Sequence, residues 1–261
     1  MSIGAPLTMI RDDAVVHVRL SRAETLNVID QTMATALAET FERLGEDSNI
    51  RVVTLRGGGK SFMAGGDLRL LRTTPKDERL ALLDGLITDF HRAVRAIRKL
   101  PAPVIAGVQG AAAGAGFSLA LACDLVVAGE KARFVPAYGR IGATPDGGLT
   151  WSLCQAVGRL RANEILMLGG AIDAMAAQSI GLINRIVPEC KLDDAIDALA
   201  KQLAAASQGS VQAIKKLVRN VDSLSFEEQL DREHEAYRQA VVGQDFETGL
   251  KAFFGGQPPR F

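Results

Sequence analysis

The stretches SFMAGGDL (residues 61–68) and GAAAGAGFS (residues 110–118) are the most informative part of this 261-residue chain. Each follows a β-branched run, at residues 52–55 and 104–108, and each leads into helix-like sequence. A strand that gives way to small residues and then to a helix leaves backbone N–H groups pointing outward, where they stabilise negative charge. Two such loops that converge would form an oxyanion hole, able to hold a carbonyl oxygen as it becomes an enolate.

Hydrophobic periodicity around these loops predicts alternating strands and helices. We expect strands at residues 14–20, 51–55, 104–108, 124–128 and 183–187, with a short strand and turn within 132–145. Helices are expected over residues 30–44 and 77–100, from the second loop to residue 123, and from residue 147 onward. Strands separated by helices indicate an α/β fold with crossover connections.

The last third of the chain, from residue 192, is predicted to be helical. Its final segment, residues 226–254, carries more apolar residues than one helix face needs, which predicts packing against a neighbouring subunit. We therefore expect a core over residues 1–195 and a helical region for oligomerisation over residues 196–261.

Composition argues against several classes of partner. Lys plus Arg and Asp plus Glu are 30 each, so the formal net charge is +0, and hydrophobic residues make up 48%. These values are typical of a globular protein that binds neither nucleic acid nor an anionic membrane. The sequence shows no signal-like N-terminus and no apolar run long enough to span a bilayer, so we expect a cytoplasmic location.

The cysteines and histidines show no metal-binding or nucleophile pattern. The 3 cysteines are far apart in sequence and lack a CxxC pair, so we interpret them as buried, unpaired residues rather than metal ligands or a disulfide framework. The 3 histidines, His17, His91 and His234, are interpreted as packed or solvated side chains.

Five motifs, in this order and at this spacing, resemble the crotonase (enoyl-CoA hydratase/isomerase) superfamily. They are SRAETLN (21–27), FMAGGDL (62–68), PVIAGVQG (103–110), AGAG (113–116) and IGATPDGG (141–148). The resemblance covers nearly the whole chain. It implies a spiral of ββα turns, C-terminal helices that build a homotrimer or a dimer of trimers, and an acyl-CoA thioester as substrate. It implies no cofactor beyond the coenzyme A of that substrate.

The resemblance also assigns candidate residues. Gly66 and Ala115 would supply the two N–H groups that hold the thioester oxygen, and a backbone donor needs a small side chain if a thioester is to approach it. The path of the adenosine and pantetheine portions of coenzyme A would be lined by Ala23, Leu26, Ala64, Asp67 and Leu68.

The expected reaction depends on which carboxylates this chain has at the positions where family enzymes carry their catalytic acids and bases. Family hydratases carry two glutamates that activate water, and the matching positions here hold Ser118 and Tyr138. Neither hydroxyl can replace a carboxylate base at neutral pH, because the ordinary pKa of tyrosine is about 10 and that of serine is far higher. Asp146 remains near the expected acyl pocket, at a position where some family isomerases carry a carboxylate, including enoyl-CoA delta isomerases and the epoxyphenylacetyl-CoA isomerase of phenylacetate breakdown.

We therefore favour an acyl-CoA isomerase in which Asp146 shifts a proton on an enoyl-CoA or ring-epoxide CoA thioester. An apolar pocket built by Phe117, Phe134, Tyr138 and Trp151 is expected to surround the carboxylate. Three alternatives stay open. Asp146 before two glycines also fits a helix N-cap, the protein could be a hydratase with an atypical site, or it could bind acyl-CoA without turning it over.

Overall fold

A sheet rich in parallel strands organises the computed structural model, which describes residues 5–261. The strands lie in the order β1-β2-β3-β4-β6-β9, and only the β1–β2 pair is antiparallel. Their bounds are β1 Leu7–Asp12, β2 Val15–Leu20, β3 Val52–Gly57, β4 Val104–Val108, β6 Leu125–Gly129 and β9 Arg185–Val187. The predicted α/β fold with crossover connections is confirmed.

A smaller sheet has the order β5-β7-β8. It contains β5 (Ala111–Ala113), β7 (Arg133–Val135) and β8 (Ile172–Asp173). Helices follow most strands: α1 Gln31–Gly45, α2 Leu68–Thr73, α3 Arg79–Lys99, α4 Ala115–Ala122, α5 Leu149–Leu168, α6 Ala174–Ser179 and α7 Leu192–Ala204. Three more complete the chain: α8 Gln208–Asn220, α9 Phe226–Val241 and α10 Gln244–Phe254.

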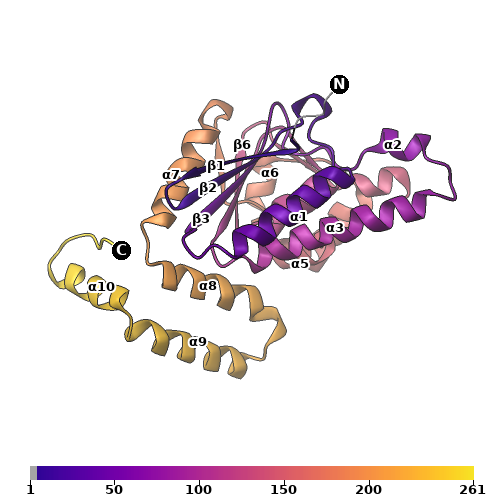
Figure 1. The fold of residues 1–261 in the computed structure, drawn as a ribbon. Coiled ribbons are helices and arrows are strands. Elements are labelled where there is room, and N and C mark those ends of the chain that lie inside the picture. The colour runs from indigo at the N-terminus through magenta and orange to yellow at the C-terminus, as the bar shows by residue number, and fades with distance from the viewer. Residues whose placement is uncertain (1–4) are drawn as a thin grey trace.

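The two faces of the main sheet are buried by different helices. Figure 1 shows α1 and α3 on one side of the strands and α7 on the other. Successive side chains along a strand point to opposite faces of the sheet, so alternate residues pack against different helices. Val53 and Leu55 join the large core cluster with α1 and α3, whereas Val52 and Ile105 pack with Ile196 of α7.

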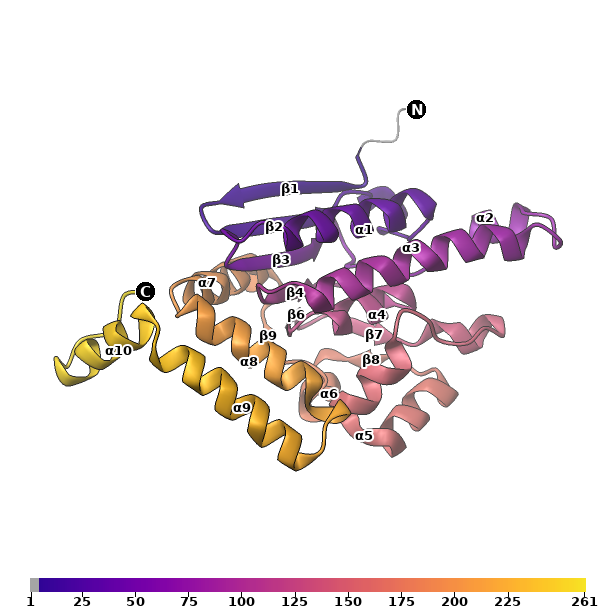
Figure 2. The same cartoon turned by 60° about the horizontal axis from the view of Figure 1, so that its bottom comes forward.

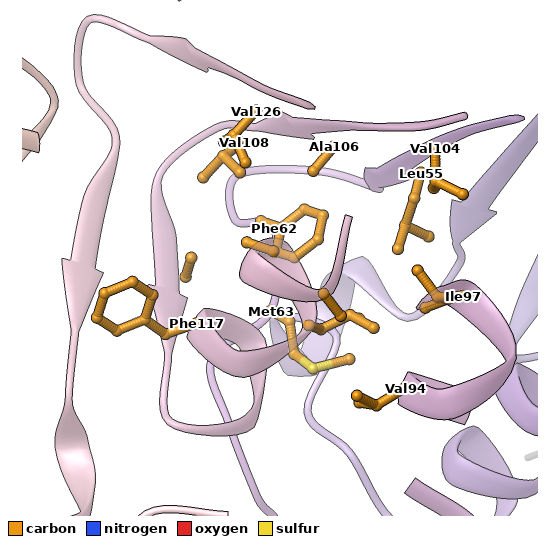
Figure 3. Close-up of a cluster of buried hydrophobic side chains, with 14 of the residues drawn as sticks. Leu55, Phe62, Met63, Val94, Ile97, Val104, Ala106, Val108, Phe117 and Val126 are labelled. Carbon is orange, nitrogen blue, oxygen red and sulfur yellow. The ribbon is translucent and has the colours of Figure 1, made fainter. Parts of the chain in front are cut away.

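The first glycine-rich loop is anchored in the core by its own side chains. Phe62 and Met63 are fully buried and lie among strand residues and Val94 and Ile97 of α3 (Figure 3). Burying a side chain of this size stabilises the fold by about 1.5–3 kcal/mol. The loop is therefore held rigidly although its neighbouring residues are mostly alanine and glycine.

The last three helices extend away from the sheet (Figures 1 and 2). None of α8, α9 and α10 contains a buried residue. Large apolar side chains remain exposed there, among them Phe226, Tyr237, Phe253 and Phe254. The predicted division after residue 195 falls within α7, which packs on the sheet.

Some local predictions need correction. Strand β1 was not expected, and strand β5 interrupts what the sequence suggested was a continuous loop. The cysteines are all free, as expected, but none of them is fully buried: Cys123 and Cys154 are half-buried and Cys190 is exposed. Cys190 lies in the short 3-10 helix Glu189–Lys191 before α7, which contains no buried residue.

Asn27 ties the first loop to the segment before α1. Its side chain is completely buried and its φ is +55°. The amide Nδ2 donates to the carbonyl oxygens of Gly58 at 2.9 Å, Ser61 at 2.9 Å and Phe62 at 3.1 Å, and Oδ1 accepts from the Arg22 N–H at 3.0 Å. One residue thus satisfies four backbone groups.

We expect Asn27→Ala to lower the free energy of unfolding by ~3 kcal/mol, because it leaves several buried backbone groups unpaired. Urea unfolding followed by circular dichroism measures the change. Asn220→Ala at the end of α8 is the control, since the Asn220 amide has no hydrogen-bond partner within residues 5–261. Equal stability of the two variants would contradict this role for Asn27.

Candidate active site

The two glycine-rich loops lie side by side because backbone hydrogen bonds join them. The Met63 N–H donates to the Ala111 carbonyl at 3.1 Å, and the Ala113 N–H donates to the Met63 carbonyl at 2.9 Å. Gly116, in the first turn of α4, completes the contact, since a Cβ there would overlap the Met63 carbonyl oxygen. The absence of a side chain therefore lets the N-terminus of α4 reach the first loop.

This contact brings Gly66 and Ala115, the predicted oxyanion donors, to one cavity. Neither backbone N–H has an acceptor within residues 5–261. Ala115 is the first residue of α4, where an N–H has no partner within the helix. A Cβ built on Gly66 would meet nothing within 4 Å. Both donors are thus available to a group that enters the cavity.

The cavity is apolar on the side of α2 and α3. Its volume is about 470 Å³, and the aliphatic side chains that line it include Leu70, Leu71, Leu82, Leu83, Leu86 and Ile87. Among residues 5–261, the charged residues lining it are Asp67 and Asp146, with no lysine or arginine. Such a wall suits a neutral acyl chain and strengthens the electrostatic effect of any dipole that points inward.

Asp146 is held at the edge of this cavity by two hydroxyl groups. The Tyr138 hydroxyl donates to Oδ1 of Asp146, and Ser118 Oγ donates to the Asp146 backbone carbonyl at 2.9 Å. The hydroxyls of Ser118 and Tyr138 lie 3.3 Å apart. Oδ2 of Asp146 has no hydrogen-bond partner within the described part of the chain. One carboxylate oxygen is therefore fixed while the other remains available.

The N-cap interpretation of Asp146 is wrong. The N-cap of α5 is Gly148, and no side chain makes a capping hydrogen bond there. Gly147 and Gly148 have φ values of +58° and +76°, so the chain turns before the helix begins and carries the Asp146 carboxylate away from the free N–H groups of α5. The carboxylate accepts a hydrogen bond from the Tyr138 hydroxyl instead.

A histidine that sequence reasoning set aside also reaches this turn. Nε2 of His91, on α3, accepts a hydrogen bond from the Gly147 N–H at 3.1 Å. His91 follows Leu83 and Ile87 at intervals of four residues, and both of these line the cavity. That helical spacing is the signal that places His91 on the cavity-facing side of α3.

Comparison with known proteins is consistent with this geometry. Residues 11–261 match the family model described as enoyl-CoA hydratase/isomerase. The chain belongs to the enoyl-CoA hydratase/isomerase family. The 1,2-epoxyphenylacetyl-CoA isomerase of Escherichia coli is 34% identical over 96% of this chain and 95% of its own length. The 2,3-dehydroadipyl-CoA hydratase of the same organism is 30% identical over 98% of each chain.

The fold is shared with solved members of the family. An enoyl-CoA hydratase from a Polaromonas species has a TM-score of 0.92 and 33% identity, covering 97% of this chain and 98% of its own. The predicted crotonase-like architecture is confirmed. Relatives named isomerase and hydratase occur at similar identity, so the reaction has to be argued from the site itself.

The residues predicted to contact coenzyme A divide into two groups. Ala64, Asp67 and Leu68 line the cavity of this family member, whereas Ala23 and Leu26 do not. Leu26 is exposed, and its carbonyl accepts from the Ala64 N–H at 3.0 Å. The Asp67 carboxylate caps α2 by accepting from the next two backbone N–H groups after Leu68, so this side chain also has a structural role.

Three residues predicted in the acyl pocket do not line the cavity. Phe117 is fully buried, within the cluster of apolar side chains drawn in Figure 3. Its ring packs on that of Phe134, with the ring centroids 5.5 Å apart. Trp151 is exposed, with the Arg98 guanidinium 4.2 Å above its ring. Ser118 is buried beside the cavity without lining it, and its hydroxyl hydrogen-bonds to Tyr138 and to the Asp146 carbonyl. The prediction of an aromatic acyl pocket is therefore wrong for these residues. Of the predicted aromatic side chains, Tyr138 lines the cavity, and leucines form most of its apolar wall.

Within residues 5–261, no helix combines the length and apolarity that crossing a bilayer requires. In the same part of the chain, no group of three or more His, Cys, Asp or Glu side chains could hold a metal ion.

The surroundings of Tyr138 predict its titration. Burial raises the pKa of Tyr138 above its ordinary value, and the nearby negative charge of Asp146 raises it further. The chain has 2 tyrosines, so Tyr237→Phe leaves Tyr138 alone. We expect its phenolate absorbance to appear only well above pH 10. Phenolate formation near pH 10 with an intact circular dichroism spectrum would contradict the buried hydrogen bond to Asp146.

Proposed function

We propose that this protein is an acyl-CoA isomerase that moves a proton with a single carboxylate. The observation that supports it most is the arrangement around one cavity. Two unengaged backbone N–H groups, of Gly66 and Ala115, share it with a carboxylate oxygen of Asp146 that has no partner within residues 5–261. A thioester whose oxygen lies against the two donors would present its neighbouring carbons to that carboxylate.

The reaction follows from these positions. The N–H groups stabilise negative charge on the thioester oxygen, which acidifies the carbon next to the carbonyl or, in an enoyl thioester, the γ carbon. Oδ2 of Asp146 takes one proton from that carbon, and the electron pair of the broken C–H bond delocalises onto the thioester oxygen as a dienolate. The protonated Asp146 then returns the proton two carbons along, so the double bond moves and no electrons are gained or lost.

The hydroxyl groups support isomerisation over water addition. By resemblance, Ser118 and Tyr138 stand where family hydratases carry glutamate, and here both hydroxyls hydrogen-bond to Asp146. Because the pKa of Tyr138 is raised by burial and by Asp146, its phenolate is not available as a base at neutral pH. This leaves Asp146 as the base of the proposed reaction.

The leucine-lined cavity supports a neutral acyl group. An enoyl chain fits this description, and so does a ring epoxide of the kind named for the Escherichia coli relative. An acyl group with a distal carboxylate would meet no cation in the lining within residues 5–261 and two acidic side chains instead.

We further propose a homotrimer or a dimer of trimers, with α9 and α10 in the contacts. Phe226 is 72%, Phe253 is 79% and Phe254 is 83% exposed. An isolated subunit would therefore leave a large apolar surface in water, which association of subunits would cover.

Mass spectrometry in deuterated water tests the reaction. Incubation with short 3-enoyl-CoA thioesters and with a ring-epoxide CoA should give isomerised product. Deuterium should enter the product of an enoyl thioester to the extent that the protonated Asp146 exchanges with the solvent before it returns the proton. Asp146→Asn should lower the isomerisation rate by about 100- to 10,000-fold, the range for removing a general base. Asp84→Asn, which neutralises an exposed carboxylate on α3, is the control and should keep the parent rate.

Other outcomes would overturn the proposal. Steady addition of water to crotonyl-CoA that survives Asp146→Asn would identify a hydratase. Tight binding of acyl-CoA without turnover of any thioester in the panel would identify a binding protein.

The oxyanion hole can be tested by deleting one donor. Ala115→Pro removes the N–H at the first position of α4, where proline suits the helix. We expect kcat to fall about 100- to 1000-fold. Gln244→Pro, at the first position of α10, is the matched control. Measuring the dissociation constant of a saturated acyl-CoA separates loss of the donor from loss of binding, and an unchanged kcat in Ala115→Pro would refute the role of this N–H.

A further inference from the structure

His91 contacts the backbone directly beside Asp146. Its Nε2 accepts the Gly147 N–H at 3.1 Å, across 56 residues of sequence. A backbone N–H can only donate, so Nε2 is the acceptor in this contact. The contact links α3, which supplies the leucine and isoleucine wall of the cavity, to the turn that presents the carboxylate.

The two edges of a single peptide plane are held. The Asp146 carbonyl and the Gly147 N–H belong to the same planar unit and point in opposite directions. Ser118 Oγ donates to the carbonyl at 2.9 Å, the Leu149 N–H donates to the same carbonyl at 3.1 Å, and His91 accepts from the N–H. Rotation of this plane would break these bonds, and the bond to His91 is the one on the N–H side. Because the plane is attached to the Asp146 Cα, its orientation determines where the carboxylate points.

The turn needs such anchors because it contains two glycines. Gly147 and Gly148 both have positive φ, and glycine can adopt many other backbone conformations. The ring of Phe90 fills the place where a Gly147 side chain would lie, and the adjacent His91 bonds the Gly147 N–H. Two consecutive residues of α3 therefore hold Gly147, one by packing and the other by a hydrogen bond.

We infer that His91 is a positioning residue for the base of the reaction. This inference rests on the proposed function, since it concerns the aim of the Asp146 carboxylate at the substrate carbon. His91 acts through the Gly147 N–H and touches neither substrate nor thioester oxygen. Its removal is expected to lower kcat while leaving acyl-CoA binding nearly unchanged, because the leucines and the oxyanion donors stay in place.

Variants at position 91 test the inference. The side-chain oxygen of Gln reaches about as far as Nε2 and can accept the same bond, whereas that of Asn is one methylene shorter and cannot. We expect His91→Asn and His91→Leu to lower kcat about 10- to 100-fold, as a misplacement of about 1 Å does. His91→Gln should recover most of the rate. All three should bind a saturated acyl-CoA within about twofold of the parent.

The control is Arg95→Leu, an exposed residue one turn further along α3, which should match the parent in kcat. The His91→Asn and His91→Gln pair keeps the test decisive if His91→Leu does not fold. Parent-like kcat in His91→Asn, or a His91→Gln variant as slow as His91→Asn, would overturn the positioning role.

The Asp146→Asn and His91→Asn variants, assayed together, separate this inference from the function on which it rests. Full activity of Asp146→Asn would refute Asp146 as the base. A slow Asp146→Asn variant together with parent-like His91→Asn would refute only the role of His91.

Discussion

The close approach of the two glycine-rich loops is the constraint on which the site depends. Two backbone hydrogen bonds between Met63 and the β5 strand hold the loops in register. Gly116 permits the contact because any side chain there would meet the Met63 carbonyl. The buried Phe62 and Met63 side chains fix one loop in the core, and the N-terminus of α4 is fixed against it. Gly66 and Ala115, whose N–H groups have no backbone acceptor within residues 5–261, thus line the same cavity as a consequence of backbone pairing.

The side chains around the two loops determine the chemical character of the cavity. In the described part of the chain, one cavity contains the donors, an aliphatic wall and the Asp146 carboxylate. The hydroxyls of Ser118 and Tyr138 both donate hydrogen bonds to Asp146, one to its backbone carbonyl and one to its carboxylate. His91 and Phe90 hold the glycine turn from the opposite side. In the proposed isomerase, a fold shared with hydratases would support proton transfer because the Asp146 carboxylate, held by neighbouring side chains, faces the substrate.

Much of this arrangement could be predicted from the sequence, for physical reasons. The loops stand out because small residues follow β-branched runs, and strands such as β4 (Val104–Val108) match their predicted bounds because they are buried on both faces. Phe117 could not be assigned to a side of α4, since nearly every residue of that helix is buried and its sequence has no polar face. The sequence does not predict the role of His91, although its four-residue spacing from Ile87 places the two side chains on one side of the helix. Its partner is a backbone N–H, and no sequence pattern marks such a group.

The proposed oxyanion hole requires that two backbone N–H groups polarise one thioester carbonyl. Isotope-edited infrared spectroscopy of a bound acyl-CoA with a ¹³C-labelled thioester carbonyl measures this directly. If both donors engage the thioester oxygen, the carbonyl stretch lies at a lower wavenumber in the complex than in buffer, and most of that shift is lost when proline replaces Ala115. A bound carbonyl that absorbs at the same or a higher wavenumber than the free thioester would contradict the proposed oxyanion hole.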